Sequence, residues 1–113
     1  MSLHKNFIAG NWVEGSSTRL NINHSDTNDI VGEYALADQV QTTQAIDAAY
    51  DSQSMWAKAT AEHRSDALDR IGTVILARRD ELGMLLSREE GKTLPEGIGE
   101  VVRAGRVFKF FAG

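Results

Sequence analysis

The stretch Glu89-Glu90-Gly91-Lys92-Thr93-Leu94-Pro95-Glu96 decides the fold of the C-terminal part of the chain. Gly91 follows an apolar periodic run and predicts a helix end in the left-handed conformation. Thr93 and Glu96 have the spacing of a capping box, and Pro95 falls in the first turn, where its missing N–H costs nothing. A stripe at helical spacing follows, which predicts one more amphipathic helix: Ile98, Val101, Val102, Gly105, Phe108 and Ala112.

Upstream of this stretch the chain has the period of helices from residue 38 onward. Asp38 is a good N-cap for a first helix that runs to about Ala57, and Thr60 is predicted to cap a second. A break in the second helical run is expected near Arg79-Asp80. The apolar positions that define the first of these helices are Val40, Ile46, Ala49, Tyr50 and Trp56.

Residues 1–37 have short apolar runs separated by Gly, Asn, Ser and Thr, a pattern typical of short strands and loops. The expected strands are Phe7-Ile8-Ala9, Trp12-Val13, Leu20-Asn21-Ile22 and residues 30–35. The predicted fold class is therefore α+β, with a short N-terminal strand or hairpin region (1–37) followed by three to four helices (38–113).

Composition narrows the classes of function. The chain has 113 residues, enough for at most one domain, and its formal charge of −4 argues against a nucleic-acid partner. No apolar run reaches the length of a membrane helix, so no membrane is expected and a cytoplasmic location is the default expectation. The absence of cysteine excludes disulfides, thiolate metal sites and thiol nucleophiles from this chain.

Isolated polar and aromatic residues offer no further site. The three histidines, His4, His24 and His63, lack the spacing of a metal site. Lys92 is expected to interact with the carbonyl end of the preceding helix. Trp12 and Trp56 are interpreted as packing residues. No residue of this chain is predicted to be catalytic or to bind a cofactor.

Five segments, in order, resemble the aldehyde dehydrogenase family. Phe7–Val13 resembles its opening I-N-G-x-W-V hairpin, and Asn23–Glu33 resembles its N-P-x-T-G-E-x-[IV]-G loop and strand, with His24 where the family has proline. Two helical segments and the final Gly-Lys turn with its Phe-Phe-Ala-Gly end complete the likeness: residues 45–57, Arg64 with Leu68 and Ile71, and residues 89–113.

The resemblance implies an α/β parent fold in which residues 38–113 form a truncated, helical part of the cofactor-binding domain. It also implies oxidation of an aldehyde to a carboxylic acid with NAD or NADP, by a cysteine thiolate and a water-activating glutamate. This chain has neither a cysteine nor a Gly-rich dinucleotide fingerprint. It is therefore interpreted as an N-terminal scaffold fragment that is inactive alone and binds no cofactor.

The expected partners are the remainder of the parent enzyme, further subunits in a homo-oligomer, and a small-molecule aldehyde for the parent. Within the family, residues 25–34 and 89–97 are most similar to enzymes that act on 2-oxoglutarate semialdehyde (2,5-dioxopentanoate).

The resemblance further implies a monovalent cation held by Glu100 and by the backbone carbonyls of Asn21 and Ile22. Hard oxygen ligands suit such an ion. Alternatively, Glu100 is a solvated residue favoured by the dipole of its own helix.

A second function remains open, a self-contained helical protein-interaction module that binds a partner through its Phe-rich helix. The N-terminal strands argue against it, and a reading frame that continues past Gly113 into a cysteine-containing segment is expected only for the enzyme. If the chain is the enzyme fragment, it is expected to self-associate when isolated, because apolar residues near Val101, Phe108 and Phe111 lack a cover.

Overall fold

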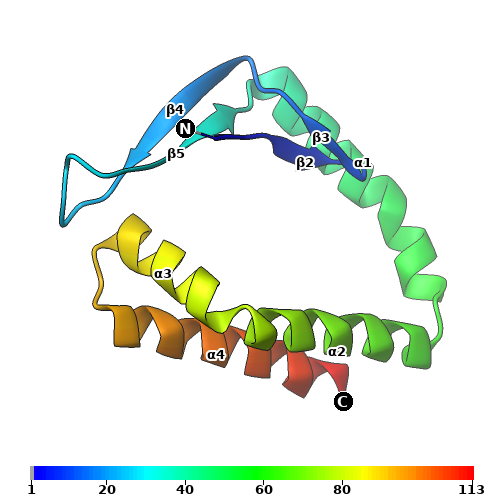
Figure 1. Ribbon diagram of the computed structural model, residues 1–113. Coiled ribbons are helices and arrows are strands. Elements are labelled where there is room, and N and C mark those ends of the chain that lie inside the picture. The colour runs from blue at the N-terminus through cyan, green and yellow to red at the C-terminus, as the bar shows by residue number, and fades with distance from the viewer. Residues whose placement is uncertain (1) are drawn as a thin grey trace. The chain divides into compact units, whose positions relative to one another are not determined.

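The computed structural model describes residues 2–113, which form two compact units (Figure 1). Unit 1 comprises the residues up to Ile22 and Thr27–Lys58, and unit 2 comprises Asn23–Asp26 and Ala59–Gly113. The predicted α+β class is confirmed, since short strands precede four helices. The bounds of the strands are β1 Leu3–His4, β2 Asn6–Ile8, β3 Asn11–Val13, β4 Ser17–Ile22 and β5 Ile30–Leu36. Those of the helices are α1 Gln39–Lys58, α2 Ala61–Ala77, α3 Arg79–Glu90 and α4 Leu94–Ala112.

Unit 1 holds two small sheets. In the first, β5 lies between β1, which is parallel to it, and β4, which is antiparallel. The β4–β5 register shifts between Asn21 and Ile22. Strand β1 was not predicted, because two residues that pair with a strand thirty positions away leave no local period.

The second sheet is the β2–β3 hairpin, closed by Ala9 and Gly10. Both residues have positive φ, 53° and 81°, as a two-residue type I′ hairpin turn requires. The expected strand Phe7–Ala9 therefore ends one residue early, because Ala9 adopts the left-handed conformation. On the hairpin, the rings of Phe7 and Trp12 lie 4.9 Å apart.

Helix α1 belongs to unit 1 and begins where predicted. The Gln41 N–H donates to Asp38 Oδ1 at 2.8 Å, which confirms the N-cap. Asn6 Nδ2 donates to Gln41 Oε1 at 2.9 Å, and Gln41 Nε2 donates to the Glu14 carbonyl at 2.7 Å, so polar bonds join helix and hairpin. Helix α1 buries no residue. Against expectation, Trp12 and Trp56 are also exposed, to 68% and 44%.

Unit 2 is built from α2, α3 and α4, with α4 running back along the other two (Figure 1). The predicted Thr60 cap of α2 is confirmed. Helix α2 ends and α3 begins at Arg78, next to the break predicted near Arg79-Asp80. Gly91 ends α3 with φ 71°. The capping box is confirmed in both directions: the Glu96 N–H donates to Thr93 Oγ1 at 3.4 Å, and the Thr93 N–H donates to Glu96 Oε2 at 3.3 Å.

Glycines set how closely α4 approaches its neighbours. A Cβ at Gly97 would lie 2.5 Å from the Gly83 carbonyl oxygen of α3, and a Cβ at Gly72 of α2 would lie 2.9 Å from that of Gly105. Backbone therefore meets backbone at two crossings. Val101 lies on α4 between these two crossings. With 8% exposure, it is the one hydrophobic residue that is buried among the described residues.

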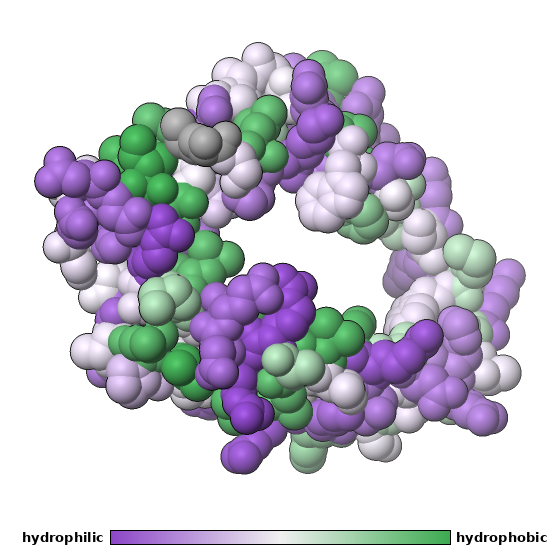
Figure 2. Space-filling view, in the orientation of Figure 1, coloured by the Kyte–Doolittle hydropathy of each residue, from purple (hydrophilic) through white to green (hydrophobic). Residues whose placement is uncertain are grey.

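Large apolar side chains lie at the surface of both units, as Figure 2 shows for one face. Among the described residues, no helix combines the length and the apolar character needed to cross a membrane.

Candidate functional site

A turn with several ionised side chains joins α3 to α4 in unit 2. Its backbone is held in place by three hydrogen bonds. The Gly91 N–H donates to the Ser87 carbonyl at 2.9 Å, Ser87 Oγ donates to the Lys92 carbonyl at 2.5 Å, and Ser25 Oγ donates to the Gly91 carbonyl at 3.1 Å. Gly91 is the residue that permits this path, because its positive φ costs a residue without Cβ very little.

Lys92 links two carboxylates across this turn. Its Nζ lies 2.8 Å from Glu90 Oε2 and forms a short ion pair with Glu100 Oε1. The hydrogen bond to Glu100 and then that to Glu90 raise the pKa of Lys92 above its ordinary value, so the ammonium stays charged. The expectation that Lys92 binds the carbonyl end of α3 is wrong, because the turn carries its side chain to acidic partners instead. Exposed ion pairs of this kind add little to stability.

The three residues predicted to hold a cation fall in different units. Glu100 lies on α4 in unit 2, whereas Asn21 and Ile22 lie on β4 in unit 1. Glu100 forms an ion pair with Lys92, and its side chain is 49% exposed, as expected for a residue on the solvated face of its helix. Over residues 2–113, no group of three or more His, Cys, Asp or Glu side chains is placed to hold a metal.

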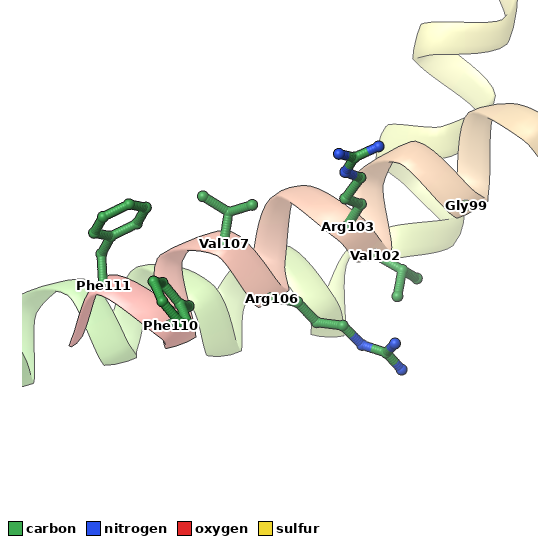
Figure 3. Close-up of a pocket in the computed structure, with 7 residues that line it drawn as sticks. All are labelled: Gly99, Val102, Arg103, Arg106, Val107, Phe110 and Phe111. Atoms are coloured by element: carbon green, nitrogen blue, oxygen red, sulfur yellow. The ribbon is translucent and has the colours of Figure 1, made fainter. Parts of the chain in front are cut away.

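The outer side of α4 forms an apolar groove with a volume of about 310 Å³. Figure 3 shows Arg103, Val107 and Phe111 on one side of the helix, and Val102 and Arg106 on the other. Val107, Phe110 and Phe111 are 46%, 76% and 69% exposed. The rings of Phe110 and Phe111 meet edge to face with centroids 5.2 Å apart.

A second groove, of about 440 Å³, adjoins the first along α4. It is lined by residues of both charges, and it shares Gly99 and Arg103 with the apolar groove: Lys92, Glu96, Gly99, Glu100 and Arg103. Within residues 2–113, Arg103 and Arg106 make no ion pair with a carboxylate. This surface can bind apolar and ionic groups, and it offers no cysteine nucleophile.

The turn was predicted from the sequence, but the ion pairs that form across the turn were not. Lys92 and Glu100 are eight positions apart, a spacing that pairs side chains on neither a helix nor a strand. Only the reversal of direction at Gly91 and the helix start at Thr93 bring them together. No motif singles out Arg103 or Arg106, whose positions resemble an ordinary solvated helix face.

Comparisons of the sequence and of the structure with known proteins point to the same family. A model of the aldehyde dehydrogenase family matches residues 12–113. The chain is 34% identical over 110 residues to the alpha-ketoglutarate semialdehyde dehydrogenase of Haloferax volcanii, covering 96% of this chain and 23% of that protein. It is likewise 34% identical over 110 residues to the alpha-ketoglutaric semialdehyde dehydrogenase of Bacillus subtilis, covering 96% of this chain and 22% of that protein.

Solved structures agree with the sequence comparison. The betaine aldehyde dehydrogenase of Staphylococcus aureus, determined in complex with NAD⁺, superposes with a TM-score of 0.91 at 29% identity. The match covers 97% of this chain and 23% of that structure. The chain thus spans about a quarter of the length of the proteins it matches.

Proposed function

Because the chain belongs to the aldehyde dehydrogenase family, we propose that it is the N-terminal scaffold of an NAD- or NADP-dependent enzyme that oxidises an aldehyde to a carboxylate. The observation that carries the proposal is the family match over residues 12–113, which includes strands β4 and β5 as well as the four helices. A self-contained helical module would have no need of those strands. We therefore prefer the enzyme scaffold to the interaction module.

The proposed substrate is 2-oxoglutarate semialdehyde. Its support is the likeness to two proteins named for that substrate, each 34% identical over 96% of this chain. We do not assign substrate recognition to any side chain of residues 2–113. The remainder of a longer enzyme, assembled as a homo-oligomer, would supply the pocket.

The catalytic and cofactor-binding groups are proposed to lie in that remainder as well. A dinucleotide site needs a Gly-rich turn between a strand and a helix with free N–H groups at the helix start. Here the starts of α1, α2 and α4 are capped by their own neighbours, Asp38, Thr60 and Thr93. The start of α3 has no side-chain cap, but α3 follows α2 directly, with no strand before it. The described residues therefore do not fit the cofactor, and the chain's part is to support the site and not to hold the nicotinamide.

A chimera tests the proposal. The chain would replace the matching segment of the Bacillus subtilis relative, and reduced nicotinamide would be followed by its absorbance with 2-oxoglutarate semialdehyde as substrate. We expect the chimera to oxidise the semialdehyde, because the 34% identity extends over 96% of the chain. A folded chimera without turnover would contradict the scaffold role. Turnover of other aldehydes but not of this one would contradict only the substrate.

A monovalent cation at Glu100, Asn21 and Ile22 remains a proposal. Lys92 already places one positive charge on the Glu100 carboxylate, so a bound ion has to displace that ammonium. In the chimera we expect sodium or potassium chloride to raise the melting temperature relative to choline chloride, and Glu100→Gln to abolish the difference. Glu90→Gln is the matched control, since Lys92 binds Glu90 too. An unchanged ion effect in Glu100→Gln would refute the site.

A further inference from the structure

We draw no further inference here: the strongest candidate, the groove of about 360 Å³ between the β2–β3 hairpin and helix α1 of unit 1, is lined by small and apolar residues such as Ile8 and Ala48, and nothing in the structure shows what covers it.

Discussion

Gly97→Ala is expected to lower the free energy of unfolding of unit 2 by about 2 kcal/mol net. The added methyl would lie 2.5 Å from the carbonyl oxygen of Gly83. That neighbour is backbone within α3, so α3 and α4 have to move apart. The gain of about 1 kcal/mol that alanine brings to a helix offsets only part of this cost.

Gly99→Ala is the matched control, two positions along the same helix. Its methyl meets no atom within 4 Å, so only the helix propensity changes and stability should rise by about 1 kcal/mol. Urea unfolding followed by far-ultraviolet circular dichroism measures both variants, at concentrations low enough to keep the chain monomeric. Equal stabilisation by the two substitutions would show that α4 does not approach α3 as described.

Val101→Asp is expected to lower the free energy of unfolding of unit 2 further, by roughly 3 to 5 kcal/mol. Val101 is 8% exposed on the side of α4 that faces α2 and α3. A carboxylate there loses its water, while the valine's own burial is lost as well. Because small domains are only marginally stable, a loss of this size should leave unit 2 unfolded at room temperature, and its cooperative unfolding transition should disappear.

Ala104→Asp is the matched control, because it separates the cost of burying a charge from the cost of placing aspartate in a helix. Ala104 lies on the same helix and is exposed, so the same charge there should cost about 0.7 kcal/mol at most. Thermal melts of the two variants provide the comparison. If Val101→Asp were as stable as Ala104→Asp, Val101 could not be the residue on which the three helices of unit 2 pack.

Local signals explain why so much of unit 2 was predictable. Gly91, Thr93 and Glu96 act through bonds to their own neighbours, and the structure has each in its expected role. Thr60 and Asp38 likewise cap the helices that follow them. Such motifs depend on a few consecutive residues, and the sequence displays them in full.

Contacts between distant segments were not predictable. Strand β1 exists because Leu3 and His4 pair with Glu33 and Tyr34, and neither segment signals the other. Lys92 reaches Glu100 only because the chain reverses at the turn. The exposure of Trp12 also escaped prediction, since residue type indicates a tendency to be covered and does not indicate which segment provides the cover.

If this chain supports an aldehyde dehydrogenase and does not itself carry the chemistry, it should bind no dinucleotide on its own. Calorimetric titration of NAD and NADP into the 113-residue chain, beside the chimera with the Bacillus subtilis relative, tests it most directly. We expect no saturable binding to the chain alone, and saturable binding of at least one of the two cofactors to the chimera. Saturable binding of either cofactor to the isolated chain would contradict it.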